Sequence, residues 1–275
     1  MCDTMLPLQG IRSRVFGPAS DVEWRSRFTV RKQGRLMIDI SNLPDKAPEY
    51  DLRDLLEAGM HFGHASAKWH PKMKEYIHME KDGVHIFDLA KTARQLRVAY
   101  NYLYSLGQAG KKVIFVGTKR QARDLLKEAA QKAEAFFVAQ RWMGGMLTNW
   151  DQISKSIRKM NDIEEGLASG RFDGYTKFER VQLEKQHGRL ERFFEGVKGL
   201  KGKPDCLVVI DPKREEITVT EAEMVEVPVI ALVDSDTDPG SVNIVIPGND
   251  DAVNSVSLVL KELTGAYAAG KKAAK

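Results

Sequence analysis

Residues 112–124 read KVIFVGTKRQARD, and this stretch decides the fold. Its first half, 112–118, is an apolar run rich in β-branched residues, which is typical of a strand buried on both faces. Its second half begins a predicted helix over 120–133, and a Gly-Thr step separates the two. The stretch therefore predicts one strand-loop-helix unit of an α/β protein.

The same alternation runs through most of the chain after residue 50. Further strands are predicted at 84–89, 136–139, 206–211, 227–234 and 243–247, and further helices at 51–59, 90–106, 218–226 and 251–263. Near-continuous apolar strands separated by helices indicate a parallel sheet covered on both faces. The fold class is therefore α/β, a doubly wound domain.

Residues 150–202 interrupt the alternation and carry no strand signal. Apolar residues recur there at steps of three and four, which predicts two helices that pack along a seam as an antiparallel hairpin, in the manner of a coiled coil. The seam positions are Ile153, Ile157, Met160, Ile163 and Leu167, then Leu183, His187, Leu190, Phe194 and Val197. Gly166, Gly170 and Gly174 are expected to form the turn, and His187 is expected to be a core histidine.

These patterns divide the chain into five segments. Residues 50–149 and 203–264 are expected to form the two parts of the α/β domain, with the hairpin of 150–202 inserted between them and a basic tail at 265–275. Residues 1–49 have no sustained period and are expected to be a disordered extension. Alternatively, translation starts at Met37, and the residues before it are translated upstream sequence.

Composition limits the class of protein. Of 275 residues, 43% are hydrophobic, which is enough for a large core, but no apolar run approaches the ~18 residues of a membrane-spanning helix. The two cysteines have no metal or disulfide spacing, which favours a reducing compartment such as the cytoplasm. No membrane association is therefore expected.

The net charge of +4 is unevenly distributed. Residues 60–125 contain twelve Lys or Arg against five Asp or Glu, whereas residues 205–251 contain two against twelve. This polarity predicts one face for a polyanion and another for water or a basic partner. The alternative is that folding scatters these charges over all faces.

The sequence contains no constellation of catalytic residues. No G-x-G-x-x-G follows a strand, and GAYAAGKK at 265–272 lacks the Ser or Thr of a phosphate-binding loop. His61, His64 and His70 together with DSDTD at 234–238 offer metal ligands, but H-x-x-H alone is a weak signal and no metal site is predicted. Lys119, Arg120 and Arg123 open a helix, where cations oppose the helix dipole unless an anion such as phosphate is bound.

Several motifs resemble one family. They are GMHFGHASAKWHPKM (59–73), GVHIFDLAKTARQL (83–96), FVGTKRQA (115–122), RWMGGMLTNW (141–150) and VIPGNDDA (245–252). Their order resembles the bacterial-type small-subunit ribosomal protein S2 family over roughly 51–263, as do LRDLLEAGMHFG (52–63) and a pattern from Pro204 to Pro228 that includes Glu215 and Glu221. The chain departs from the family at Ala65, His70, Met143 and Glu226.

The resemblance implies a flavodoxin-like three-layer αβα sandwich that carries a helical hairpin. It also implies a structural constituent of the small ribosomal subunit, at the junction of head and body, that binds small-subunit rRNA and neighbouring proteins and supports translation. In many bacteria the family is associated with docking of ribosomal protein S1. A cytoplasmic ribosome is expected, an organellar ribosome being the lesser alternative. No catalytic activity and no cofactor are implied beyond Mg²⁺ as an rRNA counterion. A flavodoxin-like enzyme that binds a nucleotide or flavin remains the alternative function.

Three groups of site residues follow. Phosphate contacts are expected from basic residues, together with stacking or packing by Trp69: Lys68, Trp69, Lys72, Lys74, Lys119, Arg120, Arg123, Arg141, Arg158 and Lys159. QRWMGGMLTNW (140–150) is expected to be a rigid joint that sets the hairpin angle through Trp142, Gly144, Gly145 and Asn149, with Thr148 or Asn149 as the helix cap. Asp234, Asp236 and Asp238 are expected to face a protein partner or Mg²⁺.

Overall fold

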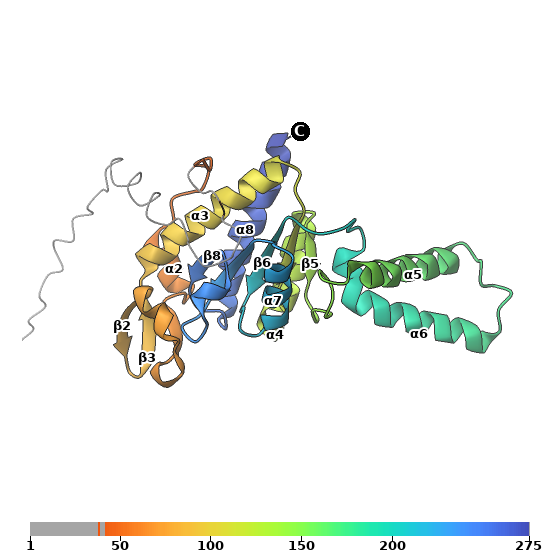
Figure 1. Ribbon diagram of the computed structural model, residues 1–275, viewed down its shortest axis with the longest axis horizontal. Coiled ribbons are helices and arrows are strands. Elements are labelled where there is room, and N and C mark those ends of the chain that lie inside the picture. Colours follow the sequence, from red (N-terminus) through yellow and green to blue (C-terminus); the bar gives the residue numbers. More distant parts are fainter. Residues whose placement is uncertain (1–37, 39–41, 275) are drawn as a thin grey trace, which may run out of the picture.

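A five-stranded parallel sheet forms the centre of the molecule, seen in a computed structural model that describes Ile38 and residues 42–274 (Figure 1). The strand order is β5-β4-β6-β7-β8, and each neighbouring pair is parallel. The strands are β4 (Val113–Val116), β5 (Phe136–Val138), β6 (Cys206–Ile210), β7 (Val229–Val233) and β8 (Ile244–Pro247). Counted along the chain, the order is 2-1-3-4-5, which is the flavodoxin-like order. The predicted doubly wound α/β fold is confirmed.

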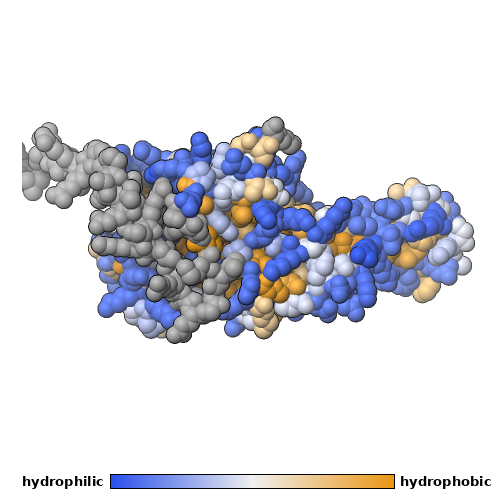
Figure 2. All heavy atoms as spheres, turned by 45° about the horizontal axis from the view of Figure 1, so that its top comes forward, coloured by the Kyte–Doolittle hydropathy of each residue, from blue (hydrophilic) through white to orange (hydrophobic). Residues whose placement is uncertain are grey.

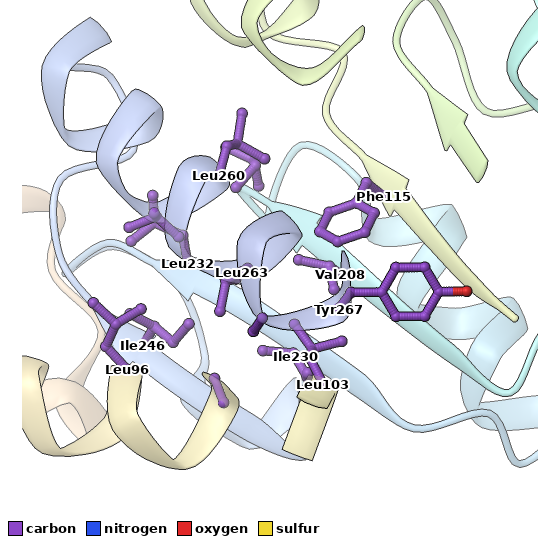
Figure 3. Packing of buried hydrophobic residues seen from close by; sticks show 14 of the residues in the cluster. Leu96, Leu103, Phe115, Val208, Ile230, Leu232, Ile246, Leu260, Leu263 and Tyr267 are labelled. Atoms are coloured by element: carbon purple, nitrogen blue, oxygen red, sulfur yellow. The ribbon is translucent and has the colours of Figure 1, made fainter. Parts of the chain in front are cut away.

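Helices cover both faces of this sheet. One face packs against α3 (Leu89–Gln108), α4 (Arg120–Lys132) and α8 (Val253–Ala274), and Figure 3 shows strand residues such as Phe115 and Val208 beside Leu263 of α8. The intervening strand residues, such as Ile114, belong to the core on the opposite face, together with α7 (Glu216–Met224) and the base of the hairpin. Because side chains alternate along a strand, each strand supplies both layers of core. Each large apolar side chain buried in this way stabilises the fold by about 1.5–3 kcal/mol.

The last helix differs from the prediction. It was expected to end at Leu263 before a basic tail, but α8 continues to Ala274, so residues 265–274 are helical. The added turns pack closely on α3: a Cβ on Gly270 would lie 2.1 Å from the carbonyl oxygen of Tyr104. Packing on α3 therefore stabilises the last three turns of α8. The spacing of apolar residues within α8 does not reveal this contact.

The strand predicted at 84–89 does not join the parallel sheet. It is β3 (Val84–Phe87), the middle strand of a separate antiparallel sheet with β1 (Phe62–Ala65) and β2 (Ile77–Lys81). Asp82 and Gly83 connect β2 to β3 with positive φ values of 54° and 75°. An Asp-Gly pair with two positive φ angles is typical of a two-residue hairpin turn, which explains the antiparallel pairing.

The hairpin extends away from the sheet domain (Figure 1). It consists of α5 (Trp150–Ala168) and α6 (Lys177–Phe194), followed by the short helix η3 (Glu195–Val197). Most of the predicted seam residues are buried, namely Ile153, Ile157, Met160, Ile163, Phe194 and Val197. The side chain of His187 is 17% exposed, and its Nδ1 lies 3.7 Å from Glu191 Oε2. The turn is shorter than expected, since α5 continues past Gly166. Figure 2 shows hydrophilic side chains over most of the visible face of the hairpin.

The segment before the fold is described only in part. The expectations for residues 1–37 and 39–41, including a start at Met37, lie outside the described residues. Residues 42–49, expected to belong to a disordered extension, lie against α3. There Asp45 pairs with Arg97 at 2.6 Å, and Asn101 accepts hydrogen bonds from the backbone N–H groups of Lys46 and Ala47. The helix α2 (Leu52–Glu57) then begins, capped by Asp51 as expected, which accepts from the N–H of Arg53.

Candidate RNA interface and hairpin joint

The carboxyl ends of the parallel strands form one edge of the sheet, which we call the carboxyl edge. The loop of 66–75, which contains the short helices η1 (Ser66–Lys68) and η2 (Pro71–Glu75), lies against this edge beside the end of β7. There the N–H of His70 donates to the carbonyl oxygen of Ser235 at 2.7 Å, and the N–H of His64 donates to Ser235 Oγ at 2.8 Å. The loop expected to bind RNA is thereby fixed to the sheet domain.

Lys119 lies within this edge rather than on the surface. Only 8% of the residue is exposed, and its Nζ lies 3.0 Å from Asp211, 2.8 Å from Asp250 and 2.7 Å from Asp251. Burial by itself lowers the pKa of Lys119, but these carboxylates outweigh it and raise the pKa. Three carboxylates already surround the ammonium group of Lys119, so within this chain the residue serves buried ion pairs, and its phosphate contact stays a prediction.

The same ion pairs fill the usual ligand position of the fold. In a sheet of this order, ligands bind at the switch point, here between the carboxyl ends of β4 and β6. Lys119 follows β4 and Asp211 follows β6, and their side chains meet across that point. Thr118 also donates to the buried carboxylate of Glu215 there. A nucleotide or flavin site at this position is therefore not favoured.

The other predicted phosphate contacts divide into two sets. Lys72 is exposed but pairs with Asp238 at 2.7 Å, and the half-buried Arg123 donates through Nε to the carbonyl oxygen of Thr118. Trp69 is half-buried with its ring 5.2 Å from that of His85. Six of the predicted cations are exposed and form no ion pair with another described residue, namely Lys68, Lys74, Arg120, Arg141, Arg158 and Lys159. We call Lys68, Lys74, Arg120 and Arg141, which lie at or beside the carboxyl edge, the edge cations.

The aspartates expected to meet a partner are engaged within the chain. Asp234 is 1% exposed, and Asp236 pairs with Lys213 at 2.7 Å. Asp238 pairs with Lys72 and also accepts from the N–H of Gly240. All three carboxylates therefore have partners within the chain, and their contact with a protein partner or Mg²⁺ stays a prediction. At this edge the fold pairs the acidic segment directly with the basic one, so the predicted separation of acidic and basic faces is not seen here.

The stretch QRWMGGMLTNW encloses an anion, but the anion is a side chain of the protein. Glu221 of α7 accepts hydrogen bonds from the backbone N–H groups of Gly145 at 2.7 Å, Leu147 at 2.9 Å and Thr148 at 3.3 Å. The indole Nε1 of Trp142 also donates to it, at 3.3 Å. Burial by itself raises the pKa of Glu221, but these donors outweigh it and lower the pKa.

Only one of the two glycines requires its residue type. Gly145 has φ +87°, and a Cβ there would lie 3.1 Å from the Cβ of Asn149. Gly144 has no positive φ, and a Cβ there would meet nothing within 4 Å. Asn149 occupies the N-cap of α5 without a side-chain cap bond, and the hydroxyl of Thr148 donates to Glu221 instead. The predicted side-chain cap of α5 is therefore wrong.

A second polar cluster at the carboxyl edge joins His64, in β1, to buried aspartates. His64 Nδ1 lies 3.0 Å from Asp234 Oδ1, and this hydrogen bond is the main reason that the pKa of His64 rises to about 9. Asp250 is 1% exposed, and burial together with the neighbouring aspartates raises its pKa to about 7. His61 and His70 do not belong to this cluster of ligand-type side chains.

Comparison with known proteins identifies the chain. The family model described as Ribosomal protein S2 matches residues 55–270. The chain belongs to this family. It is also 44% identical to the small ribosomal subunit protein uS2 of Geotalea uraniireducens (strain Rf4) over 222 aligned residues. The alignment covers 81% of this chain and 87% of that relative. The predicted resemblance is confirmed.

Membership of the ribosomal protein S2 family gives the chain a structural role in the small ribosomal subunit. Its partners are therefore rRNA and other proteins of that subunit, and the family is a structural rather than an enzymatic component. Among the described residues, no helix combines the length and apolar character needed to cross a bilayer.

Proposed function

We propose that the edge cations and the hairpin cations Arg158 and Lys159 hold the chain on small-subunit rRNA through phosphate contacts. The supporting observation is that these six side chains are exposed and have no carboxylate partner in the described part of the chain. Phosphate contacts of Lys and Arg position a protein without reading sequence, which suits a structural component. The side chains of Lys119, Arg123 and Lys72 are bound to groups within the chain. Lys72 contacts phosphate only if its ion pair with Asp238 breaks.

In this proposal the two groups of cations act at separate places. The edge cations follow or adjoin strand ends of the sheet domain, whereas Arg158 and Lys159 lie along α5 on the exposed side of the hairpin. A fixed angle between sheet and hairpin is therefore needed for both groups to reach one folded RNA. Glu221 supplies that angle by holding residues 145–148 against α7.

The test measures affinity for a small-subunit rRNA fragment across a series of salt concentrations. Each lost phosphate contact reduces the slope of log affinity against log salt by about 0.7–0.9. We expect K68Q/K74Q and R158Q/K159Q each to reduce the slope. Unchanged slopes in both double variants would contradict the proposal.

We also propose that the chain lies at the junction of head and body in a cytoplasmic ribosome and supports docking of ribosomal protein S1. Support comes from the family resemblance alone, and the three aspartates first expected to form the docking site are engaged within the chain. The test is whether small subunits depleted of this chain lose S1 in sedimentation and regain it when the purified chain is added. S1 retained at the same level without the chain would contradict this proposal.

A further inference from the structure

Two aromatic side chains are exposed at the far end of the hairpin, where α6 begins. Phe178 is 72% exposed and Tyr175 is 50% exposed. Figure 2 shows apolar side chains interrupting the hydrophilic surface of the hairpin toward this end. Neither ring belongs to either core of the described chain, so the fold does not require an aromatic residue at these positions.

The two rings line one hollow on the surface of α6, with a volume of about 570 Å³. Two amides and two cations also line it, from Gln182, Gln186, Lys185 and Arg189. From Tyr175 onward these residues recur at steps of three and four, so they share one face of the helix. We call this lined face, from Tyr175 to Arg189, the tip groove.

The turn before α6 holds one end of the tip groove in place. The ring of Tyr175 packs edge-on against Phe172 with centroids 5.2 Å apart, and its N–H donates to the carbonyl oxygen of Phe172 at 3.1 Å. The helix then begins at a capping box, in which Glu179 accepts from the N–H and the hydroxyl of Thr176 at 2.9 and 2.8 Å. The groove therefore exists before any partner binds.

The charge of the tip groove suits a polyanion. Lys185 and Arg189 are exposed, and neither forms an ion pair with another described residue. Glu179 supplies the one carboxylate among the described lining residues, and it is bound within the capping box. The phosphates of a nucleic acid strand supply the anions that these two cations lack within the chain.

Aromatic rings beside cations are the arrangement by which proteins bind single-stranded RNA, since the rings stack on unpaired bases and the cations follow the backbone. We propose that the tip groove holds a single-stranded segment of small-subunit rRNA, whose bases stack on Tyr175 and Phe178 and whose phosphates contact Lys185 and Arg189. The inference rests on the proposed contact between the hairpin and rRNA. It adds a selectivity for unpaired nucleotides that phosphate contacts alone do not give.

The first experiment compares two labelled RNA probes, a short oligouridine strand and the duplex of that strand with oligoadenosine. Fluorescence anisotropy gives the affinity of the full chain for each. We expect Y175A/F178A to lower the affinity for the single strand at least about tenfold and to leave the affinity for the duplex unchanged. M224A removes a similarly exposed apolar side chain from α7 and should change neither affinity.

Further variants separate stacking from simple apolar contact and from charge. F178W keeps an aromatic face and should bind the single strand as tightly as the unmodified chain, whereas F178L keeps an apolar side chain and should bind as weakly as F178A. K185Q/R189Q should reduce the salt slope for the single strand by about 0.7 for each lost contact. Circular dichroism confirms that each variant is folded.

The outcomes distinguish this inference from the proposed function. Unchanged affinity of folded Y175A/F178A for the single strand, while K68Q/K74Q and R158Q/K159Q still reduce the salt slope with rRNA, would overturn the tip groove and leave the proposed function standing. No affinity of the unmodified chain for any RNA would overturn both. Poor incorporation into small subunits by a Y175A/F178A variant that binds the single strand normally would assign the groove to a protein partner and also overturn the inference.

Discussion

Glu221 on α7 and Gly145 in the loop before the hairpin are joined by a hydrogen bond of 2.7 Å from the backbone N–H to the carboxylate. The bond connects residues 76 positions apart, so it fixes the start of α5 relative to the sheet domain. Neighbouring N–H groups turn toward the same carboxylate, as they would toward a bound phosphate.

Replacing Glu221 by glutamine should destabilise the chain by about 2–3 kcal/mol, because one carboxylate oxygen that accepts from backbone N–H groups becomes an amide donor. Urea unfolding measures the change. E216Q is the matched control, because Glu216 is exposed on the same helix and should change stability by less than about 0.5 kcal/mol. Equal effects of the two substitutions would show that Glu221 has no special role in the joint.

The contribution of Glu221 should depend on acidity. Its pKa in the folded chain lies below the ordinary value of 4.5, so its ionised form stabilises the fold fully above that pH. The contribution is lost as the pH falls from about 4.5 through the lower pKa of the folded chain. The difference in unfolding free energy between the unmodified chain and E221Q should therefore shrink over this range. A difference that stays constant from neutral to acidic pH would contradict the role given to the ionised carboxylate.

The two glycines of the joint should respond differently to valine. G145V forces a β-branched residue into φ +87° and against Asn149, which should cost roughly 1–3 kcal/mol and reduce incorporation into small subunits. G144V places its side chain in open space and should be tolerated. Incorporation is measured by quantifying each tagged variant in the small-subunit fraction. Failure of both variants to the same degree would mean that the loop is sensitive for a reason other than the conformation of Gly145.

Lys119 should stabilise the fold by pairing with the buried carboxylates beside it. K119M leaves Asp211 and Asp250 without their ammonium partner, and breaking a buried ion pair in this way costs about 3–5 kcal/mol. K127M, in the helix that Lys119 precedes, is the control, because Lys127 forms an exposed pair with Glu195 that contributes about 0–1 kcal/mol. Adding D250N to K119M should recover part of the loss. A stable K119M variant would contradict the account of the buried charges.

The sequence predicts the parallel sheet well because its strands are nearly continuous apolar runs. It predicts the placement of β3 badly, because VHIFDL is just as apolar and only the Asp82-Gly83 turn signals an antiparallel partner. The end of α8 is missed because its last turns are stabilised by α3, which lies far away in sequence.

Site residues are harder to predict than the fold. Lys119 follows a strand like any surface cation, and its burial depends on aspartates more than 90 positions away that the sheet order brings to it. Glu221 stands in a family signature, yet periodicity alone gives it no partner. The role of Glu221 becomes evident only from the fold, which places α7 against the Gly-Gly loop.

The most direct test of the central claim is sucrose-gradient sedimentation of a cell lysate, with mass spectrometry of peptides from this chain across the fractions, before and after a high-salt wash. A ribosomal component held by phosphate contacts should sediment with the small subunit at moderate salt and be partly released as the salt concentration rises. Peptides confined to the top of the gradient at every salt concentration would contradict the account.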